Sequence, residues 1–236
     1  MADSNLILGH RLSEWCGNGP ELEEDIALTN IALDLVGQSR FLYQELAEGD
    51  QTEDDIAYLR DAHEFTNLLI CEIPNGHYGD TITRQFLYDV YHYYLLEALS
   101  NCEDPFLQGY ARKSIKEVSY HLKHSSTWML RLGDGTEESH HKVQASLEKI
   151  WSYSGEFFQF DEVDQDVFSS LGIDAGQLQK KIEEKTKEVL REATLEIPEL
   201  LWSQTGGKTG KHTEHLGYIL ADMQFVRRAY PDAKVW

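Results

Sequence analysis

Apolar residues recur at intervals of three to five positions through most of the 236-residue chain, which is the spacing of amphipathic helices. The longest such run extends from about residue 21 to residue 48. No stretch alternates between apolar and polar residues as a half-buried strand would, and no internal repeat is visible. The pattern therefore predicts an all-α bundle of six or more helices.

Turn and capping residues divide this pattern into segments. Glycine and proline interrupt it at residues 17–20 and 74–76, and Pro198 ends a later segment. Side chains suited to cap a helix are Thr52, Asp80, Asp104, Thr136 and Thr213. We expect helices over about residues 3–15, 21–48, 52–70, 80 to at least 96, 105–133, 136–151, 174–196 and 213–229, with residues 161–166 as an acidic surface loop.

Composition narrows the possible functions. Apolar residues make up 41% of the chain, which is long enough to bury a core as one large or two small domains. The formal net charge of −20 would repel a phosphate backbone and an anionic membrane surface. We therefore expect no nucleic-acid partner and no membrane contact.

The cysteines and the first residues indicate a location. Cys16, Cys71 and Cys102 are widely spaced and odd in number, which disfavours a disulfide framework or a zinc site and fits a reducing compartment. Residues 1–11 carry no basic stretch ahead of a long apolar run, and no apolar segment approaches the ~20 residues of a membrane span. These features predict a cytoplasmic protein.

Several short motifs follow one another in order over nearly the whole chain. They occupy residues 11–17, 20–23, 74–76, 80–86, 116–121, 205–208 and 212–217. As an ordered set they resemble the C subunits of bacterial phenylacetyl-CoA epoxidases, which are multicomponent ring-activating monooxygenases. The resemblance implies a single ferritin-like helical domain over residues 1–236, with a core bundle over about 1–132 and further helices over about 136–236.

The resemblance also implies partners and cofactors. A related catalytic A subunit would carry two irons, and a reductase component would bring electrons from NADPH through flavin and iron-sulfur groups. The complex would insert one oxygen atom into the aromatic ring of a coenzyme A thioester. This chain would bind none of these cofactors, and whether it contacts the thioester stays open.

The prediction for the function rests on the positions that correspond to iron ligands in the catalytic subunit. Di-iron bundles use Glu-x-x-His pairs and further carboxylates from four helices. Compared with the catalytic subunit, ligands are lost at Asn5, Leu35, Gln38 and Val118 and kept at Asp89 and His121. We expect no metal site and no catalytic residue in this chain, and we expect Asp89 and His121 to face one another through a direct or water-mediated hydrogen bond. The predicted role is that of a structural subunit that pairs with the catalytic subunit and stabilises it.

Two alternatives remain open from the residues themselves. Asp89, Glu117, His121 and His124, with Glu97 nearby, would form an independent di-metal oxygenase or oxidase if the site were rearranged. Against this, moving the carboxylate by one residue, from position 118 to Glu117, turns it by ~100° around the helix and away from the core. The second alternative is a scaffold bundle unrelated to oxygenases.

A basic, glycine-rich segment at residues 206–211 is the other candidate for binding. Its spacing is one residue short of a phosphate loop and no strand precedes it, so it is not a nucleoside-triphosphate site. Lys208 and Lys211 precede a helix start, where they could bind an anion such as a coenzyme A phosphate or contact a partner surface. The third alternative is that the segment is a simple connector. His212 and His215 suggest zinc only weakly, because capping by Thr213 explains the same local sequence.

Overall fold

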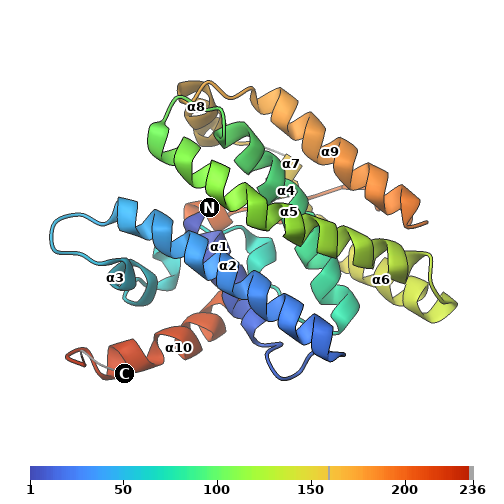
Figure 1. Cartoon of the computed structure of the whole chain (residues 1–236), viewed down its shortest axis with the longest axis horizontal. Helices are drawn as coiled ribbons and strands as arrows, with labels where there is room; N and C mark the ends of the chain where they lie inside the picture. The colour runs from blue at the N-terminus through green and yellow to red at the C-terminus, as the bar shows by residue number, and fades with distance from the viewer. Residues whose placement is uncertain (159, 234–236) are drawn as a thin grey trace. The chain divides into compact units, whose positions relative to one another are not determined.

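The computed structural model describes residues 1–158 and 160–233, and these residues form helices and turns without any strand (Figure 1). They group into two compact units, residues 1–75 with 205–236 and residues 76–204. The all-α class predicted from the periodicity is confirmed, and the helical composition is that of a ferritin-like protein. Among the described residues, no helix has both the length and the apolar character needed to cross a membrane.

The first unit is built on two long helices, α1 (Ala2–Ser13) and α2 (Leu22–Leu46). They pack along each other, and Ile7, Leu28 and Ile31 are fully buried. Gly9 permits this approach, because a Cβ atom there would lie 2.9 Å from Val36 Cγ2 and 3.2 Å from the Ala32 carbonyl oxygen. The unit also contains α3 (Glu53–Tyr58), the short 3₁₀ turns η1 (Ala62–Glu64), η2 (Leu69–Glu72) and η4 (Gly207–Thr209), and α10 (Glu214–Ala229).

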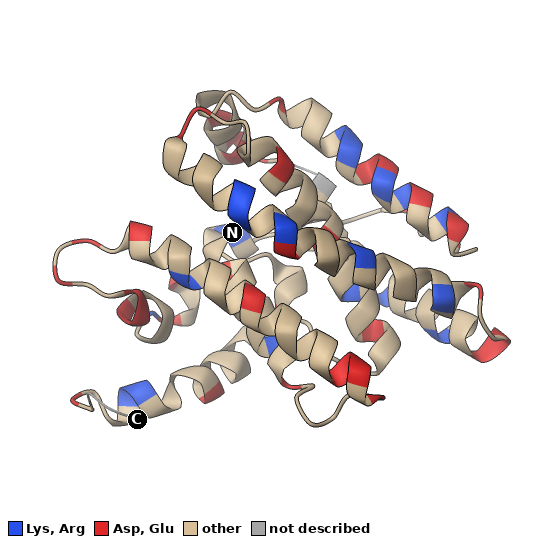
Figure 2. Cartoon of the chain, in the orientation of Figure 1, with Lys and Arg blue, Asp and Glu red and all other residues tan. Residues whose placement is uncertain are grey.

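The second unit is built on α4 (Tyr78–Leu99) and α5 (Pro105–Gly133). The shorter elements are α6 (Glu137–Ile150), η3 (Trp151–Ser154), α7 (Gly155–Phe158) and α8 (Glu162–Ser170), followed by α9 (Ala175–Glu192). Helices α6 and α9 pack against α4 and α5. The outer face of α9 alternates lysines with acidic residues, as the i,i+4 spacing predicts (Figure 2).

Most predicted helix ends are confirmed. Asp104 caps α5 by accepting from the Leu107 backbone N–H at 2.8 Å, and Pro105 is its first residue. Thr136 and Thr213 cap α6 and α10 as expected. The prediction for α4 was wrong by one turn, because His77 is the cap. The Asp80 carboxylate accepts from the His77 backbone N–H as the other half of a capping box.

Two other sequence predictions were wrong. The helix expected over residues 52–70 ends at Tyr58, and residues 59–73 form extended backbone and 3₁₀ turns instead. The acidic residues 161–166 are not a loop, because the side chain of Asp161 accepts from the Asp164 backbone N–H at 2.8 Å and starts α8. The apolar periodicity predicted too long a helix after residue 52, and the acidic composition of residues 161–166 hid the start of α8.

The C-terminal helix α10 belongs to the same compact unit as α1. The predicted division into a core over about 1–132 and further helices over about 136–236 differs from this grouping, which assigns residues 76–132 to the second unit. That the chain is a single domain stays a prediction.

Candidate functional site

In the first unit, two of the positions where we expect ligands to be lost form an amide pair. Asn5 on α1 donates through Nδ2 to Gln38 Oε1 on α2 at 3.4 Å, and both side chains are buried. Leu35 is fully buried one turn before Gln38. Two amides and an aliphatic side chain supply no anionic donor, whereas iron in such bundles is held by carboxylates and imidazoles.

In the second unit, Asp89 on α4 is fully buried and its carboxylate accepts two hydrogen bonds. Gln85 Nε2, one turn earlier on the same helix, donates to Oδ1 at 2.7 Å, and Ser125 Oγ on α5 donates to Oδ2 at 2.7 Å. Burial raises the pKa of Asp89 to about 6, although the electrostatic influence of His121 and the two hydrogen bonds act in the opposite direction. Asp89 is thus held as an internal hydrogen-bond acceptor.

The other retained position, His121, lies one turn after Val118 on α5, and both side chains are fully buried. His121 is near enough to Asp89 for its charge to lower the pKa of that carboxyl. The structure thus brings the two retained residues into the same unit, while their direct or water-mediated hydrogen bond stays a prediction. Val118 provides only methyl groups where a carboxylate would be required.

His92 is a buried residue that the sequence interpretation missed. It lies three positions after Asp89 on α4, is fully buried, and neither ring nitrogen hydrogen-bonds to any residue of its unit that the structure describes. Burial lowers its pKa to about 3, and the charge of His121 acts in the same direction. The Asp-x-x-His spacing of Asp89 and His92 was visible in the sequence.

The donor set does not fit a di-iron centre. Among the described residues, no three histidine, cysteine, aspartate or glutamate side chains lie together in a group able to hold a metal ion. The alternative site finds no support either, because Glu97 accepts from Lys181 Nζ at 2.7 Å on the surface of the second unit. That this chain binds no metal stays a prediction.

Like Asp89 in the second unit, Glu72 in the first unit is a fully buried carboxylate. The sequence interpretation missed Glu72 as well. Asn67 Nδ2 donates to Oε1 at 2.8 Å, and the Thr213 backbone N–H and Oγ1 donate to Oε2 at 2.8 and 2.6 Å. His212 Nδ1 lies 2.6 Å from Oε1, and its Nε2 lies 2.8 Å from the Phe65 carbonyl oxygen. We call Glu72, Asn67, His212 and Thr213 the Glu72 network.

The partners of His212 determine its protonation. A carboxylate and a carbonyl oxygen only accept, so the ring must donate from both nitrogens and carry a positive charge. Burial lowers the pKa of His212, but the hydrogen bonds to Glu72 and to the Phe65 carbonyl and the negative charge of Glu72 outweigh it and hold that pKa above its ordinary value. His212 is therefore engaged inside the unit, and the zinc interpretation with His215 has no support.

The basic segment at residues 206–211 is closely fitted to its own unit. A Cβ atom at Gly207 would lie 2.1 Å from the Asn67 carbonyl oxygen, and one at Gly210, whose φ is +76°, would lie 2.3 Å from the His63 carbonyl oxygen. Lys208 is half-buried and Lys211 is exposed. The two lysines are thus carried on a fixed turn, and what they bind stays a matter for proposal.

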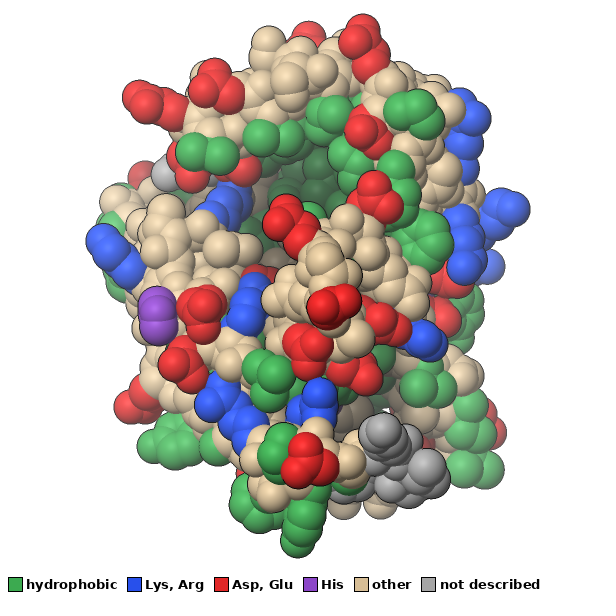
Figure 3. Space-filling model, turned by 90° about the vertical axis from the view of Figure 1, so that its left-hand side faces the viewer, with side chains coloured by type: hydrophobic (Ala, Val, Ile, Leu, Met, Phe, Trp, Pro, Cys, Tyr) green, Lys and Arg blue, Asp and Glu red, His purple; other side chains and the backbone are tan. Residues whose placement is uncertain are grey.

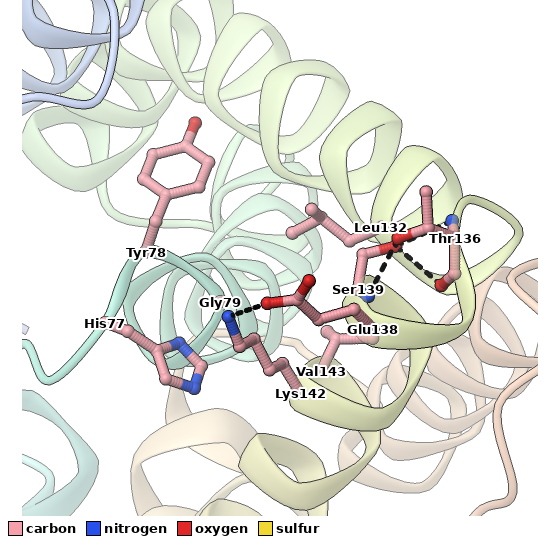
Figure 4. A pocket seen from close by; sticks show the side chains of 9 residues that line it. All are labelled: His77, Tyr78, Gly79, Leu132, Thr136, Glu138, Ser139, Lys142 and Val143. Atoms are coloured by element: carbon pink, nitrogen blue, oxygen red, sulfur yellow. Dashed lines mark hydrogen bonds and ion pairs between the residues drawn. The ribbon is translucent and has the colours of Figure 1, made fainter.

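A pocket of about 290 Å³ lies in the second unit where the first turn of α4 meets α6 (Figure 4). Its lining includes Tyr78, Leu132, Thr136 and Val143. Lys142 Nζ donates to Glu138 Oε1 at 2.5 Å on its wall, and His77 accepts from the Asp80 backbone N–H. Ion pairing and helix capping account for these charged and ring groups, so we assign the pocket no catalytic role.

Comparison with known proteins gives the family and one relative. A model of the family described as "Phenylacetic acid catabolic protein" matches residues 1–236. The chain is also similar to a protein of Escherichia coli (strain K12) that is described as the C subunit of 1,2-phenylacetyl-CoA epoxidase. The two are 43% identical over 234 residues, which is 98% of this chain and 94% of the relative.

Proposed function

The chain belongs to the phenylacetic acid catabolic protein family, and we propose that it is the non-catalytic C-type subunit of a phenylacetyl-CoA epoxidase. In this role it pairs with the related catalytic A subunit, which carries the two irons, and stabilises it. The epoxidase complex inserts one oxygen atom into the aromatic ring of phenylacetyl-coenzyme A. Electrons come from NADPH through the flavin and iron-sulfur groups of a reductase component.

One observation carries this proposal. Leu35 and Val118 are fully buried on long, regular helices. The resemblance to the catalytic subunit assigns ligands to these two positions. The helices that would carry ligands have been kept while donors were replaced by aliphatic and amide side chains. A subunit that keeps the architecture and loses the donors is best explained by a role in assembly.

In this proposal the chain contributes by holding helices in fixed positions for a partner to bind. Its buried side chains fix α1 against α2 and α4 against α5, which gives a partner preformed helical surfaces to bind. Preformed surfaces lower the entropy that association must overcome. No residue of this chain donates a proton or an electron pair to the substrate in this proposal.

The test is metal content measured together with complex formation. The chain is expressed in iron-supplemented medium, alone and with the catalytic subunit, and each purified sample is analysed for iron, manganese and zinc. We expect no stoichiometric metal in the isolated chain and iron in the co-purified complex. Two irons per isolated chain, with the near-ultraviolet absorption of an oxo-bridged pair, would refute the proposal.

For Lys208 and Lys211 we propose a contact with the catalytic subunit in preference to a coenzyme A phosphate. A fixed basic turn in a chain of net charge −20 suits an anionic surface. The double variant K208E/K211E should weaken complex formation while the fold stays intact, since the charges of one half-buried and one exposed lysine on a surface turn contribute little to stability. The matched control is K180E/K187E, which reverses two α9 surface lysines.

Titration with the catalytic subunit at low and moderate salt separates the outcomes for these lysines. Weaker binding that recovers little on adding salt supports a direct contact. Unchanged subunit affinity with a higher KM for the thioester would assign the lysines to coenzyme A. If affinity, turnover and salt dependence all match the unmodified protein, the turn is only a connector.

A further inference from the structure

Helix α2 exposes a row of large apolar side chains. Leu22, Ile26, Leu33 and Phe41 have exposed fractions of 72%, 52%, 65% and 40%. Their spacings of four, seven and eight residues return to one side of a helix with 3.6 residues per turn. Gly37 continues the row, and a Cβ atom there would meet nothing within 4 Å. We call these five residues the α2 stripe.

The α2 stripe is unusual for a chain with this composition. Single exposed apolar residues are normal, but a contiguous row rimmed by polar groups marks an interaction surface. The opposite side of α2 is already used, because Leu28, Ile31 and Leu35 are fully buried. The core of the protein therefore does not account for the stripe.

One edge of the stripe is acidic. With 3.6 residues per turn, Glu23, Asp34 and Glu45 lie along this edge of α2, and the one basic residue of the helix, Arg40, lies along the other. Arg40 Nε already donates to Glu53 Oε1 at 3.1 Å. Figure 2 shows acidic residues at the beginning of α2 and again further along it, and acidic side chains are also spread over the face drawn in Figure 3.

This charge distribution disfavours a second copy of the chain as the occupant. In a symmetric dimer the same patch lies opposite itself. A parallel pair of α2 helices would oppose Glu23 to Glu23, and an antiparallel pair would oppose Glu23 to Glu45. Like charges meet in both arrangements, and two chains of charge −20 repel at long range as well.

We propose that the α2 stripe is the surface on which the catalytic subunit docks, through a helical face of aliphatic side chains with lysine and arginine at its edge. This inference rests on the proposed function, which supplies the partner. The apolar row gives the buried centre of the contact and the acidic rim gives orientation and a faster encounter. Gly37 lets the backbone of a partner helix approach closely.

The experiment measures affinity for the purified catalytic subunit. The variant I26E/L33E places two charges in the centre of the stripe, and Kd should rise by at least about 100-fold, as at other interface centres. The matched control is V163E on α8, a residue that is 69% exposed in the second unit, and it should leave Kd within about twofold. Circular dichroism and thermal unfolding confirm that each variant is folded.

A second pair of variants keeps the test decisive if I26E/L33E does not fold. I26S/L33S removes the apolar contact without adding charge and should also weaken binding, by about tenfold or more. E23K/E45K should slow association and reverse its salt dependence, because it removes the attraction to a basic edge.

The outcomes separate this inference from the proposed function. If the unmodified chain does not bind the catalytic subunit, the proposed function fails. If it binds and both stripe variants bind equally well, only the assignment of the stripe is refuted. A self-dimer of the unmodified chain that I26E/L33E dissociates would assign the stripe to a second copy and overturn the inference.

Discussion

Glu72 in the first unit and Asp89 in the second are both fully buried carboxylates, but their surroundings differ. Glu72 accepts from an asparagine, a threonine and a charged histidine, and the last two come from the C-terminal segment. Asp89 accepts from one glutamine and one serine, and burial raises its pKa to about 6. The Glu72 carboxylate therefore links segments that lie far apart in the sequence, whereas the Asp89 carboxylate links only the successive helices α4 and α5.

The histidines of the two regions differ in the same way. His212 has acceptors at both ring nitrogens, and its pKa lies above the ordinary value. His92 has no described hydrogen-bond partner in its unit, and burial lowers its pKa to about 3. A buried charge is stable where its partners are complete, and a buried ring without partners stays neutral.

The largest expected effect is that of E72A. The substitution removes the carboxylate that the Asn67 amide, two donors of Thr213 and a charged His212 share, which should cost about 3–5 kcal/mol in the free energy of unfolding. The measurement is chemical denaturation followed by circular dichroism. The control E48A, at an exposed position of the same unit, should change stability by about 0.5 kcal/mol or less. An E72A loss no larger than that of the control would show that the Glu72 network does not hold the unit together.

The next effect separates D89A from D89N. Alanine leaves Gln85 Nε2 without its acceptor and Ser125 Oγ with only backbone carbonyls of its own helix, and it should cost about 1–3 kcal/mol. Asparagine keeps the shape and one acceptor and removes a charge whose burial is unfavourable, so its cost should be smaller. Equal losses for the two variants would show that the carboxylate charge itself stabilises the second unit.

A smaller effect concerns pH and His212. A histidine whose pKa is raised in the folded protein contributes stability that is fully present below the unfolded pKa of about 6.5 and is lost as pH rises through the folded pKa. The stability difference between the unmodified protein and H212Q should therefore shrink as denaturation is repeated from pH 6 to pH 9. A difference that stays constant or grows over this range would contradict the charged state of His212.

The smallest effect is that of H92L at neutral pH. Replacing a buried ring without hydrogen bonds in its unit by an apolar side chain of similar volume should change stability by about 1 kcal/mol or less, in either direction. Urea denaturation of both proteins at pH 7.5 measures it. A loss above about 2 kcal/mol would mean that His92 makes a hydrogen bond in solution.

Local signals in the sequence were sufficient where they act within one helix. Asp104 and Pro105 predicted the start of α5, and Thr136 predicted that of α6, because caps act over three or four residues. The helix expected to reach residue 70 was wrong because Asp61 and Glu64 form a new capping box after Tyr58. In that segment tertiary burial of Phe65 and Leu68 decides the conformation over periodicity.

The candidate site was predictable only in part. Asp89 and His121 were named from the resemblance to the catalytic subunit, and both lie buried in the second unit. Gln85 and Ser125 lie one helical turn from these residues, so helical spacing could have indicated them. The Glu72 network could not be found in this way, because His212 lies 140 positions from Glu72 and only tertiary structure brings them together.

The grouping of the chain into its two units has a consequence for biosynthesis. Residues 76–204 are continuous, whereas the first unit combines residues 1–75 with residues 205–236. A ribosome that adds about 5–20 residues per second completes the inserted unit first and translates the last segment some seconds later. Glu72 is therefore synthesised well before His212 and Thr213. The Glu72 network, and with it the first unit, can form only after residues 76–204 have been translated.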